Sequence, residues 1–244
     1  MERNDYWVVS PHADDAVLSA GALIHFLAEA GRSVGVFTIF AGHGRGERSP
    51  LALSAERLWG LGSDAVASRQ REDQRACSRL GATVRFGESP DAVYRRDPTD
   101  GTPLYAHQHE LFGEMHPHDR KATVQNVADE LTELRANHAF LVPSAHGDHV
   151  DHRIAKHAAQ LVLPDRQVWS YADLPYAESA GRRTFRGSTP SRGPVSDTDS
   201  YTVKLSAAAE YSSQLALVTG ASTSRQALAI VSSWSERFTR GFAR

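Results

Sequence analysis

The sequence predicts an α/β protein built on one mostly parallel sheet with helices on both faces. Short runs of β-branched and aromatic residues alternate with longer amphipathic segments along the chain, a pattern typical of βαβ units. The chain has 244 residues, of which 41% are hydrophobic, so it can bury one sizeable core. We therefore expect a single domain over residues 1–244.

The first half of the chain supplies the first three expected strands. Residues 6–10 (YWVVS) are a short run of β-forming residues. Asp14 or Asp15 can then cap a helix that Gly31 ends, because acidic residues favour helix starts and glycine favours helix ends. The remaining elements expected in this half are strands over 33–40 and 82–86 and a helix over 66–80.

The second half continues the alternation of helices and strands. A helix over 122–136 precedes an apolar strand over 138–144, and a helix over 149–162 precedes a strand over 167–174. The remaining elements expected here are an added strand over 201–205 and helices over 207–218 and 224–238.

Two long stretches lack regular periodicity. Residues 88–120 are rich in Tyr, His, Pro and Asp, and loops of that length inside compact domains are usually functional or disordered. Residues 180–200 are poor in apolar residues and rich in Ser, Gly, Pro and Arg, which is typical of a mobile surface insertion. This second stretch can serve either as a lid over a site or as a disordered insertion.

Two polar clusters follow the first and the fourth expected strands. His12, Asp14 and Asp15 come after the first strand, and residues 149–152 (HVDH) come after the fourth. In the common doubly wound strand order 3-2-1-4-5, these two strands are neighbours, and ligands bind between their carboxyl ends. We therefore expect the two clusters to meet in one crevice.

The residue types in this crevice indicate a metal site. Two adjacent carboxylates would repel a phosphate group but attract a cation. A catalytic zinc ion typically has three protein ligands drawn from His and Asp/Glu, with a fourth position left for water. His12, Asp15 and His152 supply that set. We expect Zn²⁺ here, and Fe²⁺ can take the same ligands.

The residues left over supply acid–base chemistry for hydrolysis of an amide or ester. Asp14 can accept a proton from the metal-bound water that attacks the acyl carbon. His149 can stabilise the oxyanion as an imidazolium and protonate the leaving amine, and Asp151 can orient His149 and keep its pKa high. His146 is the alternative to His149 for this role.

These motifs resemble those of the PIG-L/LmbE-like zinc-dependent N-deacetylases. The family's His-Pro-Asp-Asp-Glu and His-x-Asp-His motifs stand here as residues 12–16 (HADDA) and 149–152 (HVDH), so that alanine replaces the proline and the glutamate. Weaker similarity is found over 69–82, 91–96, 173–177 and 204–214. The resemblance implies a Rossmann-like, LmbE-like fold and the removal of an acetyl or similar acyl group from an N-acylated amino sugar or related amine.

The resemblance also implies a role for each motif residue. By position in the motifs, His12, Asp15 and His152 would bind zinc, and Asp14 would be the general base. The same comparison would make His149 the oxyanion stabiliser or acid, with Asp151 in support.

The substrate side of the site is expected in the 88–120 loop. Tyr94, Arg95, Tyr105 and His109 are candidates for holding a hydroxyl-rich or anionic substrate, because long loops at strand carboxyl ends build such pockets. The alternative is that Tyr94 packs in the core and Arg95 is a solvated surface charge.

Charge and composition exclude several classes of partner. The chain has 27 Lys+Arg and 29 Asp+Glu, a net charge of −2, which gives no electrostatic case for nucleic acid or a membrane surface. The first residues lack an apolar leader, and the single cysteine, Cys77, fits a reducing compartment. We expect a cytoplasmic protein that acts on a small molecule, and the sequence leaves a homo-oligomer open.

Two other functions fit the same ligand chemistry. A non-haem Fe(II) enzyme also uses two histidines and one carboxylate, but that class predicts an all-β jelly roll. A metal-dependent sugar-binding module without turnover would keep the metal ligands but would need neither Asp14 nor His149.

Overall fold

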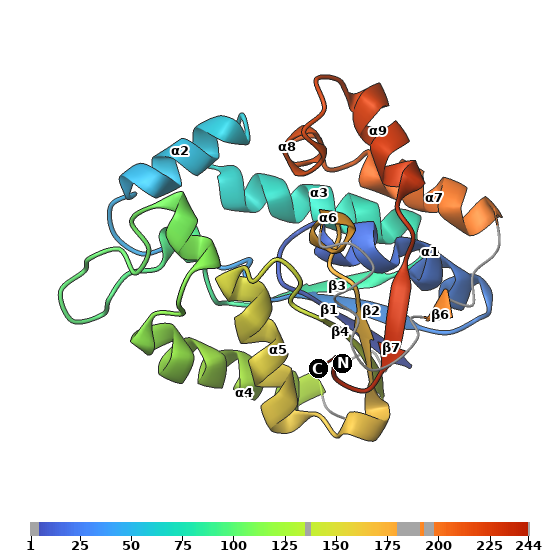
Figure 1. Cartoon of the computed structure of the whole chain (residues 1–244), viewed down its shortest axis with the longest axis horizontal. Coiled ribbons are helices and arrows are strands. Elements are labelled where there is room, and N and C mark those ends of the chain that lie inside the picture. Colours follow the sequence, from blue (N-terminus) through green and yellow to red (C-terminus); the bar gives the residue numbers. More distant parts are fainter. Residues whose placement is uncertain (1–4, 135–137, 180–190, 193–197, 244) are drawn as a thin grey trace.

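A mostly parallel sheet forms the centre of the molecule (Figure 1). The computed structural model describes residues 5–134, 138–179, 191–192 and 198–243, and its strands lie in the order β3-β2-β1-β4-β5-β7-β6. The predicted core order 3-2-1-4-5 is confirmed, with all four pairings parallel. The strands are β1 Tyr6–Ser10, β2 Val34–Thr38, β3 Thr83–Phe86, β4 Ala139–Pro143, β5 Val168–Tyr171, β6 Ser191–Arg192 and β7 Arg237–Arg240.

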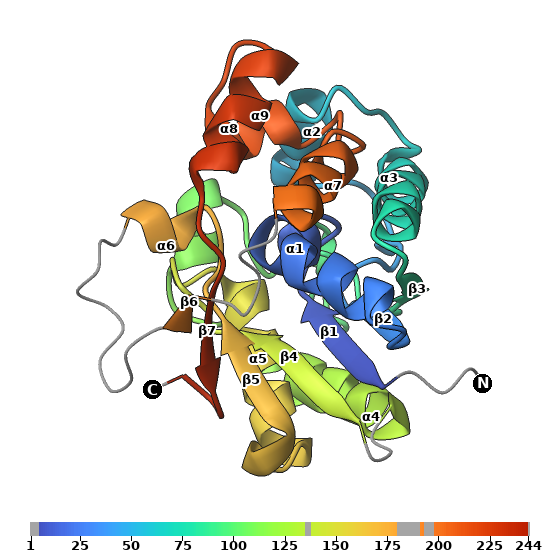
Figure 2. The same ribbon diagram turned by 90° about the vertical axis from the view of Figure 1, so that its right-hand side faces the viewer.

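Helices cover both faces of the sheet, as predicted (Figures 1 and 2). The main covering helices are α1 Asp15–Glu29, α3 Ala65–Arg79, α4 Val124–Leu134, α5 Val150–Val162 and α7 Thr198–Ala208. Alternate residues of β1 face opposite layers: Trp7 and Val9 pack with α4 and α5, whereas Val8 packs with α1, α3 and α7. None of the helices in the described ranges is long and apolar enough to span a bilayer.

The region between β3 and α4 contains short helical turns rather than a structureless loop. These are η1 Ala92–Tyr94, η2 Gln108–Phe112 and η3 Asp119–Thr123. A further helix that the sequence analysis did not predict, α2 Pro50–Leu58, follows β2 and starts at Ser49, whose side chain accepts a hydrogen bond from the Ala52 N–H. Residues of α2, η1 and η2 line the cavity of the site described below.

The C-terminal third differs from the prediction in three places. The strand expected over 201–205 is wrong, because those residues belong to α7, whose buried Ser200, Lys204, Ala207 and Ala208 follow a helical period. The helix expected over 207–218 divides into the end of α7 and the short α8 Leu215–Thr219.

The last expected helix, over 224–238, also ends earlier than predicted. It stops as α9 Ser224–Ser233, and the chain continues as β7, which pairs antiparallel with β5. Phe238 is buried, whereas Arg237 and Thr239 on either side of it are half-buried, an alternation that fits a strand rather than the expected helix. The insertion predicted over 180–200 lies outside the described residues except for β6 and the first turn of α7.

A buried ion pair fixes α1 against the C-terminal segment. Lys204 Nζ lies 2.8 Å from Glu236 Oε1, and both side chains are almost fully buried. The Glu236 carboxylate also accepts hydrogen bonds from the backbone N–H groups of Ala22 and Leu23. α1 begins at Asp15, so this pair holds the helix that carries one side of the candidate site.

Replacing Glu236 with leucine should lower the free energy of unfolding by about 3–5 kcal/mol, because the Lys204 ammonium would remain buried without a counter-charge. The double variant Lys204→Met/Glu236→Leu should lose less than Glu236→Leu alone. Chemical denaturation measures both. The control is Arg85→Met, which opens an exposed ion pair with Glu133. A loss below about 1 kcal/mol for Glu236→Leu would contradict this assignment.

Candidate active site

Two strained loops form the base of the site. β1 and β4 pair in parallel, so the loops that follow them leave the same edge of the sheet. The described non-glycine residues with positive φ all lie in these loops: Asp14 (155°), Ala145 (64°) and Asp148 (59°). Such conformations cost about 1–3 kcal/mol each and collect at functional sites. Ser10 Oγ stabilises the first loop by donating to the His12 carbonyl and accepting from the Ala16 N–H.

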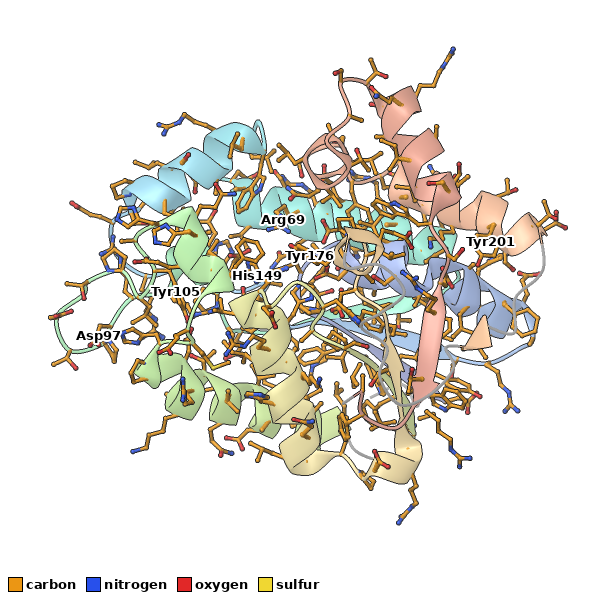
Figure 3. All side chains as sticks on the ribbon, viewed as in Figure 1. Arg69, Asp97, Tyr105, His149, Tyr176 and Tyr201 are labelled. Carbon is orange, nitrogen blue, oxygen red and sulfur yellow. The ribbon has the colours of Figure 1, made fainter. Side chains whose placement is uncertain are left out.

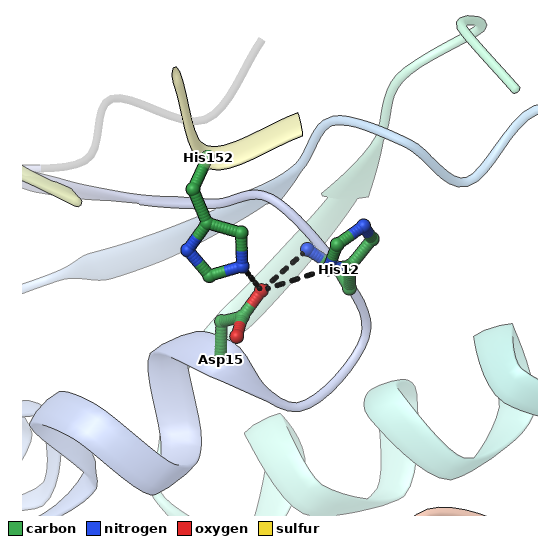
Figure 4. Close-up of side chains that lie close together, drawn as sticks. All are labelled: His12, Asp15 and His152. Carbon is green, nitrogen blue, oxygen red and sulfur yellow. Dashed lines mark hydrogen bonds and ion pairs between the residues drawn. The ribbon is translucent and has the colours of Figure 1, made fainter. Parts of the chain in front are cut away.

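The three predicted metal ligands come together at this edge (Figure 4). Asp15 Oδ2 lies 3.3 Å from His12 Nδ1 and 3.3 Å from His152 Nε2, and all three ligand atoms lie within 4.8 Å of one another. Ligand atoms bound about 2.0–2.1 Å from a tetrahedral zinc ion lie about 3.3 Å apart. The donor types and their spacing therefore fit a zinc ion.

Both histidine rings are oriented by a carboxylate on the side away from Asp15. His12 Nε2 lies 2.9 Å from Asp151 Oδ2, and His152 Nδ1 lies 2.7 Å from Asp173 Oδ1. Histidines that bind metals usually donate their other ring N–H to such a carboxylate, which fixes the ring and its tautomer. The arrangement leaves His12 Nδ1 and His152 Nε2 as the atoms that face Asp15.

The two outer carboxylates are themselves held in place. Asp151 lies 2.6 Å from the Arg95 guanidinium and accepts a hydrogen bond from the Ala92 N–H. Asp173 accepts a hydrogen bond from the His146 N–H. Arg95 also pairs with buried Asp119 at 2.9 Å. The ring of His12 is therefore connected through Asp151 to an ion network in the interior.

The electrostatic field at the ring positions strongly favours positive charge. Burial lowers the pKa of His152, but the Asp15 and Asp173 carboxylates outweigh it and raise that pKa to about 10. Burial also lowers the pKa of His12, but the Asp15 and Asp151 carboxylates outweigh this effect and raise that pKa well above its usual value. Burial disfavours ionised Asp15, yet the two histidines hold its pKa well below the usual range. The cluster is therefore suited to a cation.

Asp14 lies beside the cluster in a different environment. Burial, together with the neighbouring Asp15 charge, raises the pKa of Asp14 to about 7, although Arg69 and His12 oppose the shift. A carboxylate with a pKa near neutrality is suited to accept a proton at physiological pH. Asp14 also lines the cavity described below.

The relation expected between Asp151 and His149 is not what the structure shows. His149 caps α5 through its ring, whose Nδ1 accepts a hydrogen bond from the Asp151 backbone N–H. Burial lowers the pKa of His149 to about 3 despite the Asp151 charge, and His12 and His152 add to the lowering. The Asp151 carboxylate instead contacts His12 and Arg95. His149 is therefore a neutral ring with its proton on Nε2.

A cavity of about 360 Å³ opens above the cluster. Its floor is polar and includes His12, Asp14, Asp15, Arg69, Asp91 and His149. Figure 3 shows Arg69, His149 and Tyr176 close together around this region. Arg69 Nη1 lies 3.3 Å from Asp91 Oδ2, whereas the buried Nε of Arg69 has no hydrogen-bond partner among the described residues. The floor thus presents His12 and Asp15 of the cluster, the Asp14 carboxylate and a cationic donor to one space.

The family model described as PIG-L: GlcNAc-PI de-N-acetylase matches residues 7–163. The chain belongs to the PIG-L family. Two curated relatives, the 2'-N-acetylparomamine deacetylases of Niallia circulans and Streptomyces fradiae, are each 29% identical over 72% of the chain. The match covers 69% of the first relative and 59% of the second.

Solved structures of deacetylases share the fold of this PIG-L protein. The zinc-inhibited form of teicoplanin deacetylase Orf2 is 31% identical with a TM-score of 0.77, and the alignment covers 88% of this chain and 86% of that one. The A40926 pseudoaglycone deacetylase Dbv21 is 28% identical with a TM-score of 0.70 over 100% of both chains. The predicted LmbE-like, single-domain fold is confirmed.

The four predicted substrate residues are not among the described residues that line the cavity. Arg95 is buried, and its guanidinium pairs with one carboxylate oxygen of Asp119 and one of Asp151. The Tyr105 hydroxyl donates to the same Asp119. Tyr94 donates to Glu56, and His109 is exposed and stacks on His107. Neither proposed alternative for Arg95, a substrate contact or a solvated charge, describes this buried position.

Sequence reasoning missed several residues of the site. Asp173 comes two residues after the end of β5, just as His12 comes two residues after the end of β1. The rule that ligands bind at the carboxyl ends of parallel strands would therefore have identified Asp173 as well. Arg69 lies on the helix expected over 66–80 and Asp91 lies in the 88–120 loop, but neither was named as a site residue. The histidine left open as an alternative, His146, contacts Asp173, whereas His149 lines the cavity. The geometry therefore favours His149.

Replacing Arg95 with methionine should lower the free energy of unfolding by about 3–5 kcal/mol, because Asp151 and Asp119 would remain buried without their shared cation. Chemical denaturation in the presence of a chelator measures this. The matched control is Arg71→Met, since the Arg71–Asp64 pair has the same 2.6 Å separation but is exposed. Equal effects of the two substitutions would contradict the buried-network account.

Proposed function

We propose that this protein is a zinc-dependent hydrolase that removes an acetyl or similar acyl group from the amine of an N-acylated amino sugar. The observation that carries the proposal is the set of His12, Asp15 and His152: Asp15 Oδ2 lies 3.3 Å from a ring nitrogen of each histidine. His12, Asp15 and the neighbouring Asp14 line an open cavity. Relatives named for N-acetylparomamine and teicoplanin support an amino-sugar-linked amide.

Zinc, when bound, supplies a Lewis acid that polarises the acyl carbonyl and acidifies water. Asp14 Oδ accepts the proton of the attacking water. His149 Nε2–H donates a hydrogen bond to the carbonyl oxygen as it becomes negative, which a neutral ring can do. The proton on Asp14 then passes to the leaving nitrogen, so the amide C–N bond breaks to give a carboxylic acid and an amine.

Arg69 and Asp91 are the groups best placed to hold the sugar. Both line the cavity, and their side chains lie 3.3 Å apart. The guanidinium offers donors and the carboxylate offers acceptors, which together match the alternating donor and acceptor character of sugar hydroxyls. We therefore assign the hydroxyl contacts to this pair rather than to the 88–120 loop residues named from sequence.

The competing functions differ from a zinc hydrolase in the expected fold, in the metal or in the release of acetate. The non-haem Fe(II) oxygenase hypothesis predicts a jelly roll, and the fold is a parallel α/β sheet. A hydrolase that uses Fe²⁺ in the same site is an alternative, because the ligand preferences of Fe²⁺ overlap those of zinc. A sugar-binding module would retain an N-acetylated sugar without releasing acetate.

The metal content and the hydrolytic activity should be measured on one sample. We expect about one zinc per chain and acetate release from N-acetylated amino sugars, lost on chelation and restored by one equivalent of zinc. Zinc should not be added in excess, because a solved relative is a zinc-inhibited form. A protein that binds no metal and shows no zinc-dependent activity would contradict the proposal, and bound sugar without acetate release would favour a binding module.

Two substitutions should separate metal binding from proton transfer. His152→Ala should abolish stoichiometric zinc binding, whereas Asp14→Asn should keep the zinc and lower kcat about 10²–10⁴-fold by removing the base. For the unmodified protein, kcat/KM should rise with pH along an acid limb whose apparent pKa is no higher than about 7, since Asp14 must be ionised. Unchanged turnover of zinc-loaded Asp14→Asn would show that another group is the base.

Asp173→Asn should weaken zinc binding about 10–100-fold without removing a ligand, because it takes the carboxylate from His152 Nδ1. Competition with a chromophoric chelator measures the affinity directly. Asp165→Asn is a matched control, since Asp165 accepts a hydrogen bond from Phe242 N–H on an exposed turn. A zinc affinity equal to that of the unmodified protein would contradict the orienting role of Asp173.

A further inference from the structure

One hydroxyl group in the cavity has no part in the reaction proposed above. Tyr176, the first residue of α6 Tyr176–Ser179, lines the cavity together with His149. Its hydroxyl makes no hydrogen bond with any residue that the structure describes. The buried hydroxyls of Tyr105, Tyr171 and Tyr211, by contrast, each donate to a carboxylate or a backbone carbonyl. The Tyr176 hydroxyl is therefore available to a bound ligand.

Tyr176 and His149 belong to a group of four neighbouring rings. The centroid of the Phe112 ring lies 5.2 Å from that of His149 and 6.2 Å from that of Tyr176. On the other side, the His152 ring lies 5.7 Å from each of the same two rings. Gly147 leaves room for this arrangement, because a Cβ there would come within 2.5 Å of the Tyr176 ring. Two rings that carry a polar donor thus contact the same proposed metal ligand.

The turn that leads into α6 holds Tyr176 in place. The Leu174 N–H donates a hydrogen bond to Ser19 Oγ of α1, which fixes this turn against the helix that begins at the site. Asp173, on the same turn, orients the His152 ring through a 2.7 Å contact with Nδ1. The segment that positions a metal ligand therefore also positions Tyr176, as precise catalytic geometry requires.

The Tyr176 hydroxyl is a hydrogen-bond donor among acceptors. Burial, followed by the negative charges of Asp15 and Asp14, raises its pKa above the usual range, so the hydroxyl keeps its proton at neutral pH. Neither carboxylate accepts a hydrogen bond from it. In amide hydrolysis the group that gains negative charge is the carbonyl oxygen, and a donor already in place stabilises that charge without reorganisation.

We infer that Tyr176 is a further catalytic residue, whose hydroxyl donates a hydrogen bond to the acyl carbonyl oxygen as that oxygen becomes negative. This inference rests on the proposed function, in which His149 Nε2–H is the other donor. The carbonyl is chosen over a sugar hydroxyl because the Tyr176 ring contacts His152, beside which the amide must react. No proton leaves Tyr176, and the proton transfers remain with Asp14.

The test is Tyr176→Phe, which removes the hydroxyl and keeps the ring. It is assayed in single turnovers of zinc-loaded protein on an N-acetylated amino sugar that the unmodified protein hydrolyses. The limiting rate should fall about 10²-fold, while the enzyme concentration that gives half of this rate changes little, because the hydrogen bond strengthens in the transition state. Zinc content and melting temperature should not change, because the hydroxyl has no partner in the protein.

Tyr6→Phe is the matched control. Tyr6 is also half-buried, and its hydroxyl also has no hydrogen-bond partner among the described residues. It lies at the start of β1, however, and does not line the cavity. This variant should keep the single-turnover rate of the unmodified protein.

An activated substrate separates charge stabilisation from a structural effect. In the N-trifluoroacetyl analogue of the same sugar, fluorine withdraws electron density, so the oxyanion gains less from a hydrogen bond. Tyr176→Phe should therefore slow hydrolysis of this analogue at least several-fold less than it slows hydrolysis of the acetyl substrate. A misplaced active site would slow both substrates by the same factor.

The outcomes separate this inference from the function on which it rests. Equal single-turnover rates for Tyr176→Phe and the unmodified protein would overturn the inference and leave the deacetylase intact. A change only in the half-saturating enzyme concentration would overturn it in favour of a contact with the sugar. Loss of zinc, or equal slowing of both substrates, would overturn it in favour of a structural role. Failure of the unmodified, zinc-loaded protein to hydrolyse any N-acetylated amino sugar would count against the proposed function itself.

Discussion

The parallel pairing of β1 with β4 is the constraint on which the site depends. It brings the two strand ends to one edge of the sheet, so that loops distant in sequence supply His12 and Asp15 from one side and His152 from the other. Parallel strands carry their ligand-binding groups at their carboxyl ends, next to the point where the strand order reverses. The three residues with strained backbones belong to these same two loops, which indicates that the rest of the fold determines their shape.

Buried charge connects this edge to the interior. Asp151 and Asp173 each orient a histidine, and Asp151 depends in turn on Arg95. A lone buried carboxylate would be too costly to keep ionised, and these are ionised because cations and N–H donors surround them. The same principle applies on the other side of α1, where Lys204 pairs with Glu236. Together these contacts hold both sides of the His12, Asp15 and His152 cluster.

Much of the fold and of the candidate site could be predicted from the sequence, because the alternation of strands and helices and the polar residues at strand ends are local signals. The strand order and the meeting of His12, Asp15 and His152 followed from the two motifs and the sheet rule. The partner of Asp151 could not be predicted, because sequence proximity favours His149 whereas the fold brings His12 and Arg95 to it. Helix α7 and strand β7 were misjudged because their short, mixed sequences carry weak periodicity and tertiary contacts decide their structure.

The account's central claim is that the two strand ends hold one metal ion with defined ring atoms. Anomalous diffraction at the zinc absorption edge, from crystals loaded with one equivalent of zinc, tests it directly. The account predicts one peak about 2.0–2.2 Å from His12 Nδ1, Asp15 Oδ2 and His152 Nε2, with Asp151 and Asp173 on the far side of each ring. A peak bound through His12 Nε2 and Asp151, or elsewhere on the protein, would contradict it.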